Sequence, residues 1–188
     1  MARNPQRRSE LADAGLRILA REGARGLTHR AVDDEAGVPK GTTSNYFRSR
    51  EDVIAGLIER IGERLKPDPN VHEPLAAQAP SPELFADYIR DIVARLLGNP
   101  DVTLALFELR LEASRRPEIR EVLGSWQRSN FRGDVEFNLA AGLPGGAKEV
   151  ALFHYAIDGL LLDRLTYPID PDTSTDDIVD SLVEGLLR

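Results

Sequence analysis

The chain has 188 residues, no cysteine, three histidines and a formal net charge of −7. Its length favours one small module joined to a larger body, and the missing cysteine excludes disulfides, thiolate zinc sites and cysteine nucleophiles. Residues 1–50 hold 10 Lys and Arg against 6 Asp and Glu, a net of +4, whereas residues 51–188 hold 14 against 25, a net of −11. A basic first part is typical of a surface that approaches nucleic acid; chance clustering on a solvated surface is the alternative.

The N-terminus is basic, with Arg3, Arg7 and Arg8, but amphipathic sequence follows it instead of an apolar run. A signal peptide or a membrane span is therefore not expected, and the sequence indicates a cytoplasmic protein without a membrane partner. The three arginines are either a flexible arm that reaches the minor groove or nearby phosphates, or a frayed, solvated terminus.

Apolar residues recur at helical spacing along the chain without sustained strand alternation, so the fold class is all-α with about nine helices. The first helix is expected after Ser9, with Gly23 and Gly26 closing it. Thr28 is suited to cap a short second helix, and Gly37 to end it in the left-handed conformation. A short turn separates that helix from a third, at residues 40–47.

A capping box at residues 49–52 predicts a fourth helix that continues to about residue 65. Five prolines between residues 67 and 82 then exclude one continuous helix there and indicate a boundary. We therefore divide the chain into a helix-turn-helix domain at 1–50, a connecting helix at 51–66 and a helical body at 67–188.

Five further helices are predicted in the body, and all but the fourth begin at a cap or a first-turn proline. The first three start near residues 81, 99 and 117. The fourth, at 148–167, is apolar nearly all round, and the last, at 175–188, carries one apolar stripe. These last two helices must bury apolar surface in the subunit's own core or against a partner.

Two short helices joined by a tight turn form a helix-turn-helix, in which the second helix enters the major groove of DNA. The residues of that helix are short and polar, with one aromatic, and are suited to phosphates and base edges. They are Lys40, Thr42, Thr43, Ser44, Asn45 and Tyr46.

Three stretches together, at residues 26–28, 36–42 and 46–53, resemble the N-terminal module of the TetR family of transcription regulators. The resemblance covers about residues 9–60. It implies that Thr28 and Arg30 hold phosphate and that Arg50, at the head of the fourth helix, meets phosphate too. It further implies that Lys40, Gly41, Thr42 and Thr43 face the groove, and that Tyr46 touches the DNA backbone.

Three residues depart from the family pattern. Ser44 stands where the family usually has a DNA-contacting tyrosine, Thr43 where it prefers an aliphatic residue, and Asp33 where it prefers alanine. The first two departures bear on base preference more than on the fold.

The resemblance also implies the function: a regulator that binds a palindromic operator on double-stranded DNA as a homodimer, most simply a repressor that a small-molecule effector releases. One helix-turn-helix offers few contacts, so two copies a helical turn apart are needed. In the family the last two helices of each subunit form an intersubunit four-helix bundle. Here both helices could instead be buried in the core of a single subunit.

The effector is unidentified, and its pocket is expected among aromatic and polar side chains of the body. The candidates are Phe107, Arg110, Trp126, Asn130, His154 and Asp158. For His154 and Asp158, four residues apart, a satisfied structural pair is the alternative. Trp126 could equally be core.

Neither a cofactor nor a metal is expected, and the chain is not predicted to be an enzyme. The histidines fall in three different regions, and the glycine-rich loop at 142–148 lacks the lysine–hydroxyl ending of a phosphate-binding loop. Two other functions stay open: a helix-turn-helix activator without ligand, and a small all-α ligand-binding protein or enzyme.

Overall fold

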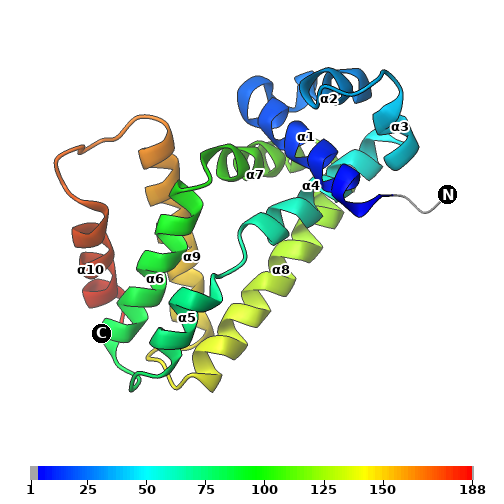
Figure 1. Cartoon of the computed structure of the whole chain (residues 1–188). Coiled ribbons are helices and arrows are strands. Elements are labelled where there is room, and N and C mark those ends of the chain that lie inside the picture. Colours follow the sequence, from blue (N-terminus) through cyan, green and yellow to red (C-terminus); the bar gives the residue numbers. More distant parts are fainter. Residues whose placement is uncertain (1–3, 188) are drawn as a thin grey trace. The chain divides into compact units, whose positions relative to one another are not determined.

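The computed structural model describes residues 4–187 and contains only helices, turns and loops in that range (Figure 1). Its contacts divide the chain into two compact units. Unit 1 comprises the described residues up to Lys66 together with Asn99–Trp126, and unit 2 comprises Pro67–Gly98 and the described residues from Gln127 on. The division differs from the predicted domains, because Asn99–Trp126 packs with the head and not with the body.

Unit 1 is built around the long first helix, whose apolar stripe is fully buried. Its helices are α1 (Pro5–Gly26), α2 (His29–Glu35), α3 (Thr42–Tyr46), α4 (Arg50–Arg64), α7 (Pro100–Ala113) and the N-terminal part of α8 (Pro117–Ala140). The α1 helix packs against α2, α4 and α7. Leu19, Leu57, Ile61 and Leu109 are each at most 1% exposed, so three of these helices share one core.

Unit 2 holds the remaining helices: α5 (Pro69–Ala76), α6 (Pro82–Leu97), the rest of α8, α9 (Ala147–Leu165) and α10 (Thr175–Leu186). The α6, α9 and α10 helices pack on one another. Phe85 and Phe153 lie at the centre, with ring centroids 4.7 Å apart. A tilted aromatic contact of this kind adds to the free energy gained by burial.

Several helix ends lie where the sequence placed them. The Oγ atoms of Thr28, Ser49, Ser81 and Ser174 each accept a backbone N–H at 3.1 Å from three residues further on. Gly37 has φ +64°, which confirms the predicted left-handed end of α2. Hydroxyl caps therefore begin four of the helices, and a glycine ends α2, as local chemistry predicts.

The chain has ten helices in its described part, one more than the nine we predicted. The additional helix is α5, which begins at a proline, contains Pro74 and buries none of its residues. Asp68 caps it by accepting the N–H of Asn70 at 2.9 Å. The five prolines predict a boundary without one continuous helix over residues 67–82; the short α5 still forms there, because Pro69 occupies the first turn, where no N–H is needed.

The start of α1 also differs from the prediction. Asn4 caps the helix by accepting the N–H of Gln6 at 3.0 Å, so the helix begins five residues earlier than expected. Arg7 and Arg8 are therefore helical, and Arg8 contacts Glu59 at 2.8 Å and lies over the Phe47 ring at 4.5 Å. The flexible-arm hypothesis is wrong for these two residues, and Arg3 lies outside the described range.

Substitution of Gly56 in α4 tests the packing of unit 1. A Cβ added at Gly56 would lie 2.4 Å from Cε1 of Phe47, which is only 1% exposed and cannot move aside. We expect Gly56→Ala to lower the free energy of unfolding by about 1–3 kcal/mol, because overpacking strains a filled core. Thermal or denaturant unfolding measures the change.

Gly62→Ala in the same helix is the matched control. Its added Cβ would make only an ordinary contact, 3.4 Å from Trp126 Nε1. Alanine is favoured over glycine inside helices by about 1 kcal/mol, so this variant should be at least as stable as the parent. Equal stability of the Gly56 and Gly62 variants would contradict the packing described here.

Candidate nucleic-acid interface

The second and third helices form a helix-turn-helix, with a turn at residues 37–41 between them (Figure 1). Both ends of the turn are glycines with positive φ, +64° at Gly37 and +87° at Gly41. A side chain at either position would be strained in this conformation. The turn thus brings α3 against α2, the arrangement in which a recognition helix is presented to DNA.

The exposed residues at this end of unit 1 include four of the predicted contacts: Lys40, Gly41, Ser44 and Asn45. Thr42 is half-buried, and its hydroxyl donates to the carbonyl of Pro39 at 2.5 Å. Tyr46 is also half-buried and packs against the core of unit 1. The amide of Asn45 and the ammonium of Lys40 are therefore the longest polar groups that α3 and its preceding turn offer to a base or a phosphate.

Thr43 is the clearest departure from the predicted set. It is 0% exposed, and its Oγ1 and backbone N both donate to Asp33 Oδ1, at 2.6 and 2.7 Å. A side chain so placed cannot reach a base edge. The prediction that Thr43 faces the groove is wrong, because its hydroxyl is used to attach α3 to α2.

Asp33 completes this attachment, which we call the Asp33 clasp: the three hydrogen bonds that its carboxylate accepts from residues 41 and 43. The third bond comes from the backbone N–H of Gly41, at 2.7 Å. Burial of Asp33 disfavours its charge, but the bonds from Thr43 and Gly41 outweigh burial and hold the pKa of the carboxyl below its ordinary value of 3.8. The carboxylate is thus ionised and lies at the N-terminus of α3, where a negative charge is favoured.

Sequence reasoning missed the clasp, although both of its side chains were noted as unusual. Asp33 and Thr43 each depart from the family pattern, and the structure shows that the two departures contact one another. The signal that could have found them is the pairing: a buried carboxylate requires donors, and a threonine ten residues later supplies two.

Thr28 and Arg30 lie at the start of α2 and are both exposed. The Thr28 hydroxyl oxygen caps the helix through the N–H of Ala31, which leaves its O–H free to donate. Arg30 lies 3.8 Å from Asp34, a contact long enough to be weak. Both positions are compatible with the predicted phosphate contacts.

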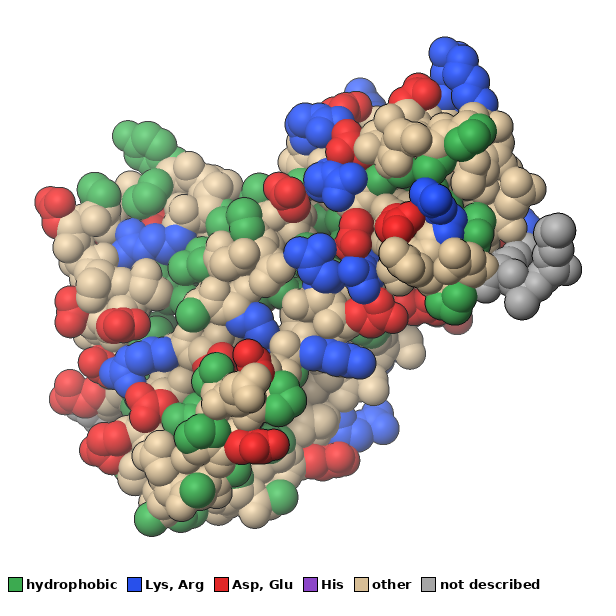
Figure 2. All heavy atoms as spheres, in the orientation of Figure 1, with side chains coloured by type: hydrophobic (Ala, Val, Ile, Leu, Met, Phe, Trp, Pro, Cys, Tyr) green, Lys and Arg blue, Asp and Glu red, His purple; other side chains and the backbone are tan. Residues whose placement is uncertain are grey.

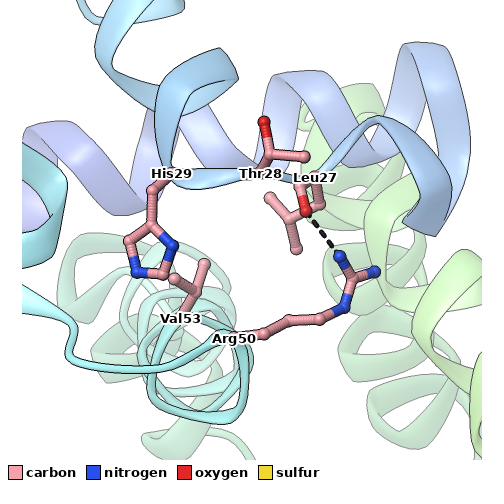
Figure 3. A pocket seen from close by; sticks show the side chains of 5 residues that line it. All are labelled: Leu27, Thr28, His29, Arg50 and Val53. Atoms are coloured by element: carbon pink, nitrogen blue, oxygen red, sulfur yellow. Dashed lines mark hydrogen bonds between the residues drawn. The ribbon is translucent and has the colours of Figure 1, made fainter. Parts of the chain in front are cut away.

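Arg50 has an internal role that the sequence did not indicate (Figure 3). Its side chain reaches from α4 to the C-terminal end of α1, where Nη1 donates to the carbonyl of Leu27 at 2.6 Å and Nη2 to that of Ala24. Beside it lies a pocket of about 190 Å³, lined by Leu27, Thr28, His29, Arg50 and Val53. The phosphate contact of Arg50 stays a prediction. Loss of this side chain would also remove the hydrogen bonds that hold the residues before α2 against α4.

Ion pairs neutralise many cations of unit 1. Figure 2 shows blue and red side chains interspersed over the part that α1 and α2 form, at the upper right. Glu35, for example, pairs with Arg17 at 2.7 Å and with Arg21 at 3.1 Å. In the described part of unit 1, the exposed cations without an ion-pair partner include Arg25, Lys40 and Arg48. Arg48, immediately after α3, is a candidate phosphate ligand that the sequence analysis did not single out.

The six predicted effector residues do not cluster within one unit. Phe107, Arg110 and Trp126 belong to unit 1, whereas Asn130, His154 and Asp158 belong to unit 2. Trp126 packs on the core of unit 1. His154 Nε2 lies 3.0 Å from Asp134 Oδ2, a partner on α8 that helical spacing alone could not reveal.

Two further features of the described part bear on other functions. No helix in residues 4–187 combines the length and the apolar character that a bilayer crossing requires. Within the same range, no three histidine or acidic side chains are grouped so that they could hold a metal ion.

Comparison with known proteins agrees with this architecture. Residues 11–57 match the family model "Bacterial regulatory proteins, tetR family", and residues 80–188, more than half of the chain, match "Tetracyclin repressor-like, C-terminal domain". The HTH-type transcriptional regulator BetI of Rhizobium meliloti (strain 1021) is 29% identical over 160 residues, which are 84% of this chain and 77% of BetI.

Solved structures give the same result. A TetR family member, SCO1917 from Streptomyces coelicolor A3, is 27% identical, with a TM-score of 0.72 and coverage of 98% of this chain and 99% of that one. The multidrug binding protein EbrR, complexed with imidazole, is 26% identical, with a TM-score of 0.66 and coverage of 98% and 92%. These relatives are regulators or ligand-binding members of one fold, and the chain itself is a helix-turn-helix transcription regulator that belongs to the TetR family.

Proposed function

We propose that this regulator binds a palindromic operator as a homodimer and represses transcription until a small-molecule effector bound in unit 2 releases it. The observation that carries the DNA-binding part is the Asp33 clasp, which holds α3 against α2 with Lys40, Ser44 and Asn45 exposed. An isolated helix of five residues would not be stable in water. The clasp therefore supports a surface that is preorganised for a groove.

An exposed apolar face on α9 supports the homodimer. Tyr155 and Leu162 are 70% and 48% exposed, and together with Gly159 they follow the spacing that places residues on one side of a helix. A Cβ added at Gly159, or at Gly185 of α10, would meet nothing within 4 Å. We assign this face to a second copy of the chain, in keeping with the bundle that the family resemblance implies.

A polar cluster inside unit 2 is the place where an effector would act. His72 contacts Asp91 at 3.0 Å, and Asp91 contacts Arg95 at 3.1 Å. The charges of Asp91 and Asp134 both interact favourably with Arg95. Burial lowers the pKa of Arg95 from its ordinary value. EbrR has been solved with imidazole, ethidium and proflavin; for this chain we propose only that a small molecule binds in unit 2.

Release follows if the effector prefers a conformation of the dimer whose two recognition helices no longer match successive major grooves. Only such a difference in affinity between two conformations can move the DNA equilibrium. Selection of bound fragments from the source genome, followed by a thermal-shift screen of small molecules, tests the whole proposal. Failure to enrich any duplex would overturn the regulator's DNA-binding part, and operator affinity unchanged by every stabilising compound would overturn release.

Substitutions at the exposed end of α3 test the DNA surface. We expect Lys40→Ala to weaken binding to all duplexes and to reduce the slope of log affinity against log salt by about 1, because one phosphate contact is lost. Asn45→Ala should instead change base preference by about 1–3 kcal/mol at one position. Fluorescence anisotropy at several salt concentrations measures both effects.

Arg132→Ala is the control for the lysine, since it removes an exposed cation of unit 2. It should leave the salt slope as it is in the parent. A parental salt slope in the Lys40 variant, together with parental base preference in the Asn45 variant, would show that α3 does not read DNA.

Substitution of Asp33 tests the clasp. Replacing its carboxylate by an amide would direct an NH₂ group at backbone donors. We therefore expect Asp33→Asn to lower the free energy of unfolding by about 1–3 kcal/mol and to weaken DNA binding, because α3 loses its attachment. Thr43→Val should cost about 1.5–3 kcal/mol, because it removes a hydrogen bond to an ionised group, whereas Thr43→Ser keeps the hydroxyl. Thermal unfolding and anisotropy report the two effects.

The clasp also predicts a pH dependence. Folding lowers the pKa of Asp33, so the ionised carboxylate stabilises the native state above 3.8, its ordinary value, and this contribution is lost as the pH falls through the lower native value. The stability difference between the parent and Asp33→Asn should therefore shrink in acid. If the stability difference between the parent and Asp33→Asn stayed constant as the pH fell below 3.8, the Asp33 carboxylate would not be ionised in the clasp.

A charge on the α9 face tests the homodimer. We expect Leu162→Glu to yield monomers in analytical ultracentrifugation and to weaken operator binding, because a carboxylate in an apolar interface is costly. Val122→Glu, on an apolar side chain of unit 1 that is 44% exposed, is the matched control. If both variants sediment like the parent, the second copy does not cover this face.

A further inference from the structure

Unit 1 contains a groove outside the helix-turn-helix that its described function does not use. Its volume is about 740 Å³, and its walls are the end of α1, at residues 20–25, and the end of α7 with the turn that follows it. Charged side chains from both walls line it: Arg21, Glu22, Arg25, Glu108, Glu112, Arg115 and Arg116. An open groove with this lining fits a polar, charged partner and not an apolar one.

Several of the groove arginines are exposed, and two of the three carboxylates are held by arginines. The side chains of Arg21 and Arg115 are 57% and 67% exposed. Glu112, only 13% exposed, contacts Arg116 at 2.6 Å and Arg115 at 3.4 Å. Arg25 has no ion-pair partner among residues 4–187. The groove therefore presents exposed guanidinium groups to an approaching anion.

One side chain opposes this charge. Glu108 has no ion pair in the described part of the chain and borders the groove beside Gly23, whose added Cβ would lie 3.3 Å from its Oε2. It is the one wall carboxylate that no described cation of unit 1 neutralises. Four arginines and three glutamates line the groove, but Arg21 also pairs with Glu35 outside it, so Arg25 is the lining arginine whose charge no described carboxylate neutralises, and Glu108 opposes it.

The groove wall formed by residues 20–25 leads along the chain directly to the start of α2, which is assigned to DNA. Arg25 precedes Thr28, the cap of α2, by three residues, and Arg50 holds the carbonyls on either side of this stretch, at Ala24 and Leu27. Hydrogen bonds from its own backbone and from Ser49 lower the pKa of Glu51, and the charges of Arg50 and Arg116 act in the same direction. The contribution of Arg116 is the smallest of these, so the charge of the groove reaches the start of α4 only weakly.

We propose that this groove is a second phosphate-binding surface, which holds the sugar–phosphate backbone of the duplex beside the half-site that α3 reads. The inference rests on the proposed operator binding and extends its footprint to the α1–α7 groove. Guanidinium groups suit phosphate because they donate several hydrogen bonds in one plane. Contacts of this kind add affinity and orientation without base preference.

Salt dependence of binding to a long duplex tests the groove directly. Arg25→Ala and Arg115→Ala should each reduce the slope of log affinity against log salt by about 1 on a duplex that extends beyond the half-sites, with base preference unchanged. On a duplex trimmed to the half-sites, neither variant should differ from the parent. Arg132→Ala, in unit 2, should match the parent on both duplexes.

Glu108→Gln should change DNA affinity in the opposite direction to the arginine variants. Removing the unneutralised carboxylate should raise affinity for the long duplex and leave affinity for the trimmed duplex unchanged. Glu136→Gln, an exposed carboxylate of α8 in unit 2, is its control and should have no effect. Arg115→Lys keeps the charge and should retain the parental slope, which separates loss of a phosphate contact from a disturbed fold.

The outcomes distinguish this inference from the function on which it rests. If the Arg25 and Arg115 variants keep the parental slope while Lys40→Ala lowers it, the groove does not bind DNA and operator binding by α3 stands. If their effect persists on the trimmed duplex, the contact lies within the half-site and the flanking assignment is wrong. If Lys40→Ala also has no effect, operator binding itself fails.

Discussion

One buried carboxylate determines how this protein can present its recognition helix. The α3 helix has five residues and no capping side chain of its own, so its position must come from contacts outside it. Asp33 supplies them, because it accepts the N–H of Gly41 and both donors of Thr43 within 2.7 Å. The same bonds satisfy a charge that burial alone would neutralise. The attachment of α3 to α2 therefore depends on this interaction.

The other side of the helix-turn-helix is held by equally specific packing. Phe47 ends α3, is fully buried, and lies so close to α4 that only glycine fits at position 56. His29 at the start of α2 contacts the carbonyl of Phe47 through Nε2 at 2.8 Å, and Arg50 ties α4 to the segment before α2. The three short elements of the head thus have little freedom to move separately, which is what groove recognition requires.

Sequence alone was sufficient for what depends on local chemistry. Helical periodicity, four hydroxyl caps and the left-handed Gly37 predicted the fold class and most helix ends. Prediction from sequence failed where the outcome depends on a distant residue. Thr43 is of a residue type suited to a groove contact, but its hydroxyl bonds to Asp33. The short helix α5 was missed because Pro74 lies inside it, where proline is disfavoured, whereas Pro69 occupies the tolerated first turn. Pairing between segments and the exact placement of prolines, not composition, decided these cases.

The net charge divides differently between the two folded units than between the first fifty residues and the rest of the chain. Within residues 4–187, unit 1 carries 16 Lys and Arg against 15 Asp and Glu, and unit 2 carries 6 against 16. The head is thus nearly neutral once α7 and the start of α8 are counted with it, so its attraction for DNA must come from where its unpaired cations lie. An acidic unit 2 is repelled by phosphate, and the regulator can approach a duplex favourably only through the exposed arginines and lysines of unit 1.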